Sequence, residues 1–271
     1  MPPSPVRYTE AREYPLKRAI ILPGSVEARV NSVVAGEVAG LVVELLGREG
    51  MTVQEGQPLA RLRTTNLELR RDAAAAQLKE AEARLKQAER NLDRASELLE
   101  AEVISEQDYD DRFYEFNAWH GRVEQLTADI ARLNDDIDRS TIRAPFPGVV
   151  TAERTEVGQW LAVGDPVVEL LAVNDLEVRV DVPEQYFDSL RLGAPARVTF
   201  ESLPGLEVRG RISAIIPRAD PQARTFPLKV RLRNPKGRIG VGMLAQVSFP
   251  GGESYEATVV PKDAVVTRGA Q

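Results

Sequence analysis

The feature of this sequence that most constrains its fold is a segment that occurs twice. Residues 32–62 align without a gap on residues 140–170. Glycine can adopt a positive φ and proline fixes φ in turns. Glycines and prolines at matching positions of the two copies therefore indicate that both copies make the same turns. The identical positions are Ser32 and Ser140, Gly40 and Gly148, Val42 and Val150, Gly50 and Gly158, Gly56 and Gly164, Pro58 and Pro166, and Leu62 and Leu170.

Strand-like runs separate these glycines in both copies, among them 41–46 and 166–171. Neither copy is long enough to bury a core alone, so we expect the two to pair as halves of one flattened barrel or sandwich. The pattern of glycine, valine and proline resembles the half-motif of biotinyl and lipoyl carrier domains. In carriers a tight hairpin between the halves presents a modified lysine. Here the joining segment is 63–139, and its lysines, Lys79 and Lys86, lie within a helical pattern, so the carrier residue is missing.

The inserted segment 66–139 is predicted to be a long antiparallel helical hairpin. Its first arm, from Leu67 to Leu99, should rise about 50 Å at 1.5 Å per residue. Thr65 with Glu68 is typical of a capping box at its start. An unbroken heptad seam of alternating spacings runs along this arm: Ala74, Leu78, Ala81, Leu85, Ala88, Leu92, Ala95 and Leu99.

The returning arm has larger seam residues, which small alanines on the first arm allow to approach closely. One three-residue step, Val123 to Leu126, predicts local overwinding. We expect Phe113 and Phe116 in the core. For Tyr114 and Trp119, two roles remain as alternatives: packing in the core or forming a platform for a ligand. The expected seam is Tyr109, Phe113, Phe116, His120, Val123, Leu126, Ile130, Leu133 and Ile137.

The turn of the hairpin is apolar where a polar turn would be ordinary. Val103 and Ile104 stand at the far end of the rod, and exposed apolar residues there indicate docking. Ser105 with Asp108 three residues later predicts an N-cap for the returning helix.

After the second copy, the sequence from Leu176 to Phe249 alternates between apolar and polar residues in short runs separated by glycine, proline and asparagine. Five or six strands at this spacing predict a small antiparallel barrel, joined by an N-terminal strand near Arg18–Glu27. Residues 251–271 resemble the opening of a further domain.

Composition excludes several classes of function. A net charge of −6 and a pI near 5.2 argue against nucleic acid as a partner. The chain has no cysteine, which excludes thiol catalysis, disulfides and thiolate metal sites. His120 is the single histidine and is expected to be a packing or surface residue, and no lysine motif follows the glycines to form a phosphate loop. We therefore expect no enzyme activity, no catalytic residues, no cofactor and no metal.

The order of a split lipoyl-like domain, a helical hairpin and a β-barrel resembles the periplasmic adaptor subunits, or membrane fusion proteins, of tripartite efflux pumps of the resistance-nodulation-division type. The family's tip motif of arginine, leucine and serine falls on Arg94, Leu98 and Ser105. Segments 223–235 and 240–244 resemble its barrel, with Val241 in place of the usual proline.

The resemblance implies a multidomain, mainly β protein with a long coiled-coil hairpin. The expected division is a partial membrane-proximal β-domain (1–17 and 251–271), a β-barrel (18–29 and 174–250), a split lipoyl-like domain (30–65 and 140–173) and the hairpin (66–139). It also implies a non-enzymatic adaptor for multidrug efflux. The duct-binding residues at the tip would be Arg94, Leu98, Val103, Ile104 and Ser105.

Partners implied by the resemblance are an inner-membrane transporter, an outer-membrane channel and further copies of the chain, in a hexameric ring that forms a sealed conduit. The implied location is the periplasm, with inner-membrane association in a full-length form. The alternatives are an adaptor of an ATP-driven exporter or type I secretion system, a biotinyl or lipoyl carrier component, and a structural coiled-coil linker. A copper or silver relay is disfavoured, because Met1, Met51, Met243 and one histidine supply few soft ligands.

Overall fold

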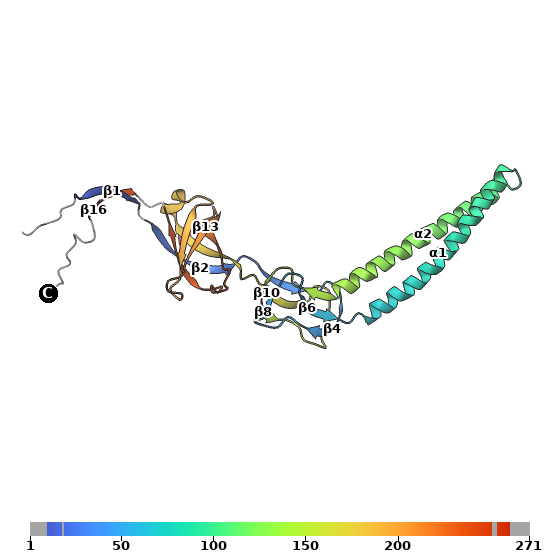
Figure 1. Cartoon of the computed structure of the whole chain (residues 1–271), viewed down its shortest axis with the longest axis horizontal. Coiled ribbons are helices and arrows are strands. Elements are labelled where there is room, and N and C mark those ends of the chain that lie inside the picture. The colour runs from blue at the N-terminus through green and yellow to red at the C-terminus, as the bar shows by residue number, and fades with distance from the viewer. Residues whose placement is uncertain (1–9, 18, 251–253, 261–271) are drawn as a thin grey trace, which may run out of the picture. The chain divides into compact units, whose positions relative to one another are not determined.

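The computed structural model describes residues 10–17, 19–250 and 254–260. The chain forms two compact units, one made of Met1–Val30 with Ala172–Gln271 and the other of Asn31–Leu171. Figure 1 shows the helices and the labelled strands of both units. Residues 1–9 and 261–271, which hold most of the expected membrane-proximal segments, lie outside the described residues.

The two copies of the repeated segment form one domain with two four-stranded sheets. The first copy supplies β3 (Asn31–Ala35), β4 (Gly40–Leu45), β5 (Thr52–Val53) and β6 (Pro58–Leu62). The second supplies β7 (Thr141–Arg143), β8 (Gly148–Glu153), β9 (Trp160–Leu161) and β10 (Pro166–Leu171). The sheets have the orders β3-β10-β8-β5 and β7-β6-β4-β9, so each combines strands of both copies. The predicted split domain is confirmed.

Each strand of one copy has an equivalent strand in the other copy, and replacing every strand by its equivalent turns the strand order of one sheet into that of the other. Gly50 N donates to Val150 O at 2.8 Å, and the equivalent Gly158 N donates to Val42 O at 2.9 Å. Gly50 and Gly158 have φ of +80° and +92°, a region that glycine enters without strain. Matched glycines thus mark matched turns in space as well as in sequence.

The core of this domain lies between the sheets and is drawn almost equally from both copies. Equivalent positions are buried in pairs, such as Val42 with Val150 and Leu62 with Leu170. The remaining members of the core are Leu45, Val53, Leu59, Ala60, Ile142, Ala144, Leu161, Val167 and Val168.

The helical hairpin grows from two adjacent strands of this domain. Strand β6 leads into α1 (Thr65–Glu100), and α2 (Glu106–Arg139) leads into β7. Strands β6 and β7 pair in antiparallel fashion, and Leu62 N donates to Ser140 O at 2.8 Å. The two helices therefore begin and end beside each other, which lets them run antiparallel (Figure 1).

The alanine seam of α1 is confirmed. Ala81, Ala88 and Ala95 are buried, and the leucines between them are partly buried. A small buried side chain every seven residues lets the facing helix approach closely.

The expected register of the first half of α2 was wrong. Phe113 is 42% exposed and His120 is also exposed, its Nδ1 3.9 Å from a carboxylate oxygen of Glu124. The side chain that faces inward beside His120 is Trp119. From Phe116 onward, the apolar residues of α2 that are partly or fully buried are spaced alternately by three and four, so no overwinding is required. They are Phe116, Trp119, Val123, Leu126, Ile130, Leu133 and Ile137; Tyr109 is also partly buried, whereas Arg112, at the seam position between Tyr109 and Phe116, is exposed.

The predicted capping box at the start of α1 was also wrong. Thr64, one residue earlier, is the N-cap and makes no side-chain bond to the helix backbone. Its hydroxyl donates instead to a carboxylate oxygen of Glu68 at 2.7 Å.

The other unit contains a closed six-stranded barrel, as predicted. Its strands follow the order β11-β14-β13-β12-β15-β2, and alternate residues point inward to a core that includes Val178, Val230, Val247 and Phe249. A short helix, Glu184–Ser189, follows β11. The strands are β2 (Ile20–Ala28), β11 (Asp175–Pro183), β12 (Pro195–Thr199), β13 (Glu207–Ile215), β14 (Thr225–Arg233) and β15 (Leu244–Phe249). Separately, β1 (Arg12–Lys17) pairs with β16 (Ser254–Val259).

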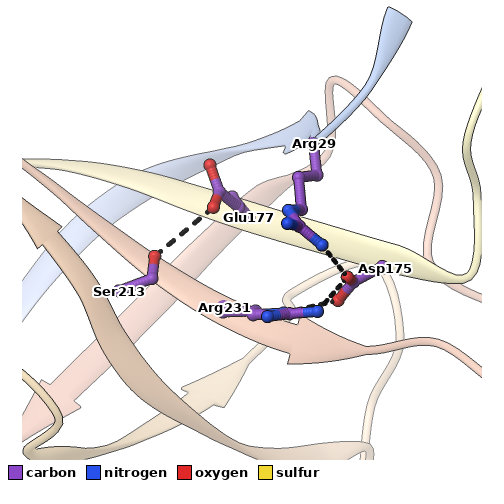
Figure 2. A network of polar contacts seen from close by, with 5 residues as sticks. All are labelled: Arg29, Asp175, Glu177, Ser213 and Arg231. Carbon is purple, nitrogen blue, oxygen red and sulfur yellow. Dashed lines mark hydrogen bonds and ion pairs between the residues drawn. The ribbon is translucent and has the colours of Figure 1, made fainter.

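One carboxylate joins three segments of the barrel. Asp175 at the start of β11 accepts hydrogen bonds from Arg29 Nη1 at 2.8 Å and from Arg231 Nε at 2.9 Å (Figure 2). The bond from Arg231, followed by that from Arg29, holds the pKa of Asp175 below its usual value, against the opposing effect of partial burial. The ion pairs thus tie the end of β2 and the end of β14 to β11.

We predict that Ala88→Leu destabilises the hairpin by about 1–3 kcal/mol, because extra methylenes overpack a filled seam. Ala76→Leu is the control, since Ala76 is exposed on the same helix. Urea titration followed by circular dichroism measures both variants. Equal midpoints for the two would contradict the close approach of the helices at Ala88.

A second prediction concerns pH. Because the folded-state pKa of Asp175 is lowered, its ion pairs contribute stability above the unfolded-state pKa of about 4 and lose it as pH falls below that value. Asp175→Asn should therefore lower the free energy of unfolding at pH 7, and the difference from wild type should shrink toward pH 3.

The matched control is Asp181→Asn on the same strand, where the carboxylate oxygen lies 3.7 Å from Arg179 Nε. Urea unfolding at both pH values should show a smaller difference for this variant. An Asp175→Asn deficit that stays constant from pH 7 to pH 3 would refute the ion-pair explanation.

Candidate functional site at the hairpin tip

The first helix ends in a tight hydrogen-bonded motif. Val103 N donates to Leu98 O at 2.8 Å and Glu102 N donates to Leu99 O at 2.9 Å. This pair of bonds is the Schellman pattern, in which the residue after the cap takes a left-handed conformation. Here that residue is Glu102, with φ +58°. A position that usually holds glycine thus carries a charged side chain at some cost in strain.

The predicted N-cap of the second helix is confirmed, and it forms a complete capping box. Asp108 N donates to Ser105 Oγ at 3.2 Å, and Ser105 N donates back to Asp108 Oδ2 at 3.2 Å. The Ser105 hydroxyl also donates to Asp108 Oδ2 at 2.6 Å, and this bond is the main reason that the pKa of Asp108 is lowered. Both ends of the turn are therefore fixed by local bonds.

A hollow of about 470 Å³ lies between the helices just behind this turn. Helix α1 supplies its residues at helical spacing, the turn supplies Ile104, and α2 supplies two charged residues. The lining is Asn91, Arg94, Ala95, Leu98, Ile104, Asp108 and Arg112. The surface combines an apolar floor with polar and charged edges.

The charges around the hollow are unevenly paired. Arg112 Nη1 lies 3.3 Å from Glu115 Oε2 on its own helix. For Arg94, no carboxylate oxygen lies within 4.0 Å in the part of the chain that the structure describes. The Arg94 guanidinium thus keeps donors available for a binding partner.

Three of the predicted site residues line this hollow together: Arg94, Leu98 and Ile104. Val103 stands outside it with a side chain that is 66% exposed. Ser105 is exposed and makes the cap described above. The five residues therefore lie within one small region of the tip, although they do not form one lining.

Sequence reasoning missed two groups on the wall of the hollow, Asn91 and Arg112. Asn91 stands one turn before Arg94 and Ala95, and Arg112 stands one turn after Asp108. Correct assignment of the α2 register, with Arg112 in place of Phe113, would have pointed to Arg112.

Among the described residues, no three His, Asp or Glu side chains converge in a metal-binding cluster. Within those same residues, neither long helix has a stretch apolar enough to cross a bilayer.

We predict that Glu102→Gly stabilises the hairpin by up to about 1 kcal/mol, because it relieves left-handed strain that exceeds the backbone entropy cost of glycine. Glu102→Ala is the control: it removes the same charge but keeps the strain. Thermal unfolding followed by far-ultraviolet circular dichroism compares the two. A glycine variant no more stable than the alanine variant would show that Glu102 is unstrained.

Two family models match this chain over the elements described above. Residues 68–137 match the RND MFP alpha-helical hairpin domain, and residues 178–253 match the CusB-like beta-barrel domain. The first match covers nearly all of α1 and α2, and the second covers most of the barrel.

Relatives with known names cover most of the chain. It is 28% identical over 264 residues to membrane fusion protein MtrC of Neisseria gonorrhoeae, a match that covers 92% of this chain and 64% of MtrC. It is 24% identical to multidrug resistance protein MdtA of Photorhabdus laumondii, covering 97% of this chain and 68% of MdtA. The chain thus spans just under two thirds of MtrC.

A solved structure shares the fold. MacA from Actinobacillus actinomycetemcomitans matches with a TM-score of 0.72 at 15% identity, over 93% of this chain and 83% of MacA. Hairpin, barrel and relatives agree, and the chain belongs to the membrane fusion proteins, the periplasmic adaptors, of the resistance-nodulation-division type.

Proposed function

We propose that this protein is a non-enzymatic adaptor that links an inner-membrane efflux transporter to an outer-membrane duct. The tip of the hairpin would bind the duct, and the barrel unit would face the transporter. Copies of the split domain would assemble as a hexameric ring in the periplasm and form part of a sealed conduit. The name of MtrC, a membrane fusion protein, supports the adaptor role, and the name of MdtA, a multidrug resistance protein, supports multidrug efflux as the class.

The observation that carries this proposal is the hollow at the tip. Leu98 and Ile104 offer an apolar floor, while Arg94 offers guanidinium donors without a carboxylate partner of its own among the described residues. The end of a helical duct presents carbonyl oxygens that lack intrahelical partners, and charge-assisted hydrogen bonds from arginine suit such acceptors. Val103, 66% exposed, adds apolar area beside the hollow.

The rest of the hairpin supports the same role. Helix α1 has 36 residues, a rise of about 54 Å, and its ends are held at one side by paired strands and at the other by the Schellman motif and the capping box. A rod fixed at both ends presents its tip in a defined orientation. Such preorganisation reduces the entropy cost of binding.

The test is the double variant Arg94→Glu with Leu98→Asp in a full-length version of the protein. We expect a loss of export, measured as drug accumulation in cells, with the unfolding midpoint nearly unchanged. Arg94 is exposed and Leu98 only partly buried, so neither change removes core packing. Wild-type export by this variant would reject the tip as the duct-binding site.

The matched control is Leu69→Asp with Arg84→Glu. Leu69 is 65% exposed near the start of α1 and Arg84 is exposed in its middle, so the same chemical changes fall away from the tip. The control should export normally. A control that is equally defective would attribute the loss to the altered charge of the rod.

A further inference from the structure

The barrel carries a basic hollow although the whole chain is acidic. Its volume is about 340 Å³. Four cationic side chains line it: Arg209 from β13, Arg233 from β14, and Lys236 and Arg238 from the loop that follows. A net charge of −6 for the chain makes such a concentration of positive charge on one surface unusual.

The strand register forces these cations together. Arg209 stands directly opposite Arg197 in the β12–β13 pair, and Arg211 stands opposite Arg231 in the β13–β14 pair. Continuing the second register by two residues brings Arg209 level with Arg233. Like charges directly opposite each other destabilise a sheet, so this arrangement costs stability.

Neighbouring arginines are neutralised, but those of the hollow are not. Arg231 is bound by Asp175, as Figure 2 shows, and Arg197 Nε lies 3.1 Å from Glu207 Oε1. Glu207 is the one acidic residue on the lining, and Arg197 already engages it. In the described part of the chain, none of the four cations of the hollow has a carboxylate oxygen within 4.0 Å.

Hydrogen bonds from the buried side chain of Asn234 hold the loop that carries Lys236 and Arg238. This side chain is 3% exposed; its Nδ2 donates to Val173 O and to Ile239 O, both at 2.9 Å. Ile239 N donates back to Asn234 Oδ1 at 3.1 Å. The loop therefore keeps its shape without a ligand, and the two cations it carries are preorganised.

The floor of the hollow is apolar. Ile239 is buried, and Leu206 and Val208 are partly buried against the barrel core. Cations at the edge of an apolar floor suit a ligand that has both an anionic group and a hydrocarbon part. The volume is within the range of small-molecule sites.

We propose that this hollow binds an amphiphile with a phosphate group, its phosphate among Arg209, Arg233, Lys236 and Arg238 and its apolar part on Leu206, Val208 and Ile239. The source is either a lipid headgroup in a membrane surface or a soluble phosphorylated amphiphile. In both cases the ligand supplies the negative charge that the neighbouring strands do not.

Isothermal titration calorimetry with the whole chain tests this. The probes are dihexanoyl phosphatidic acid below its micelle concentration, dihexanoyl phosphatidylcholine and inorganic phosphate. We expect phosphatidic acid to bind at least about tenfold more tightly than either of the others, since only it matches both parts of the site. If phosphatidylcholine bound as tightly as phosphatidic acid, the cations would not contribute to recognition. If inorganic phosphate bound as tightly as phosphatidic acid, the apolar floor would not contribute. Either result overturns the proposal.

The variant is Arg209→Gln with Arg238→Gln, which should weaken binding of phosphatidic acid by at least about tenfold, roughly the loss of one charge-assisted hydrogen bond. Arg179→Gln with Arg218→Gln is the matched control: both residues are exposed in the same unit, outside the lining, and the charge change is identical. Arg209→Lys with Arg238→Lys should retain most of the affinity. Unchanged binding by the glutamine variant overturns the proposal.

Co-sedimentation with phosphatidylcholine vesicles that contain phosphatidic acid distinguishes the two sources. Binding to vesicles that the glutamine variant loses assigns the site to a lipid surface. Binding of the short-chain lipid with no vesicle binding assigns it to a soluble amphiphile. Binding of a polyglutamate peptide, with no binding of any phosphate probe, would assign the surface to an acidic protein partner and overturn the proposal.

Discussion

The mixing of strands from the two copies in each sheet is the constraint on which the unit Asn31–Leu171, with its helical hairpin, depends. Each sheet takes two strands from each copy, and backbone bonds such as Gly50 to Val150 and Gly158 to Val42 join the copies in both directions. Within one copy only two strands pair, β4 with β6 or β8 with β10, so each four-stranded sheet is completed only when residues about a hundred positions apart meet. Once the domain has closed, β6 and β7 are neighbours, so α1 begins beside the point where α2 ends.

This arrangement explains how a long insertion is tolerated. The insertion replaces one connection between paired strands, and its own core is a separate seam of alanines against larger residues. Folding of the β-domain and packing of the hairpin thus depend on different sets of side chains. The tip, at the far end, depends only on local bonds at Glu102, Val103 and Ser105.

Features that depend on local spacing were predictable from the sequence. The split domain followed from matched glycines, the α1 seam from unbroken alternation, and the Ser105 cap from its partner three residues later. The α2 register was not, because hydrophobicity favoured Phe113 over Arg112. The interrupted spacing at Val123 and Leu126 that followed from this choice was interpreted as local overwinding, although it indicated the other register. At the start of α1, two adjacent threonines left the N-cap one residue uncertain. The hollows were out of reach, since Arg209 and Arg233 meet only through strand register, which the sequence does not state.

The seam also determines how the reach of this rod can change in evolution. Addition of seven residues to each arm would preserve the alternation of small and large seam positions and lengthen the hairpin by about 10 Å. In a straight helix, the seam rotates by only about 20° around the helix axis over seven residues, and supercoiling compensates for this rotation. The tip would therefore keep its orientation relative to the base of the hairpin. Insertions of other lengths would rotate the tip relative to its base. The length of the hairpin can therefore change in steps of seven residues per arm. Relatives that span gaps of different width need alter neither the β-domain nor the turn.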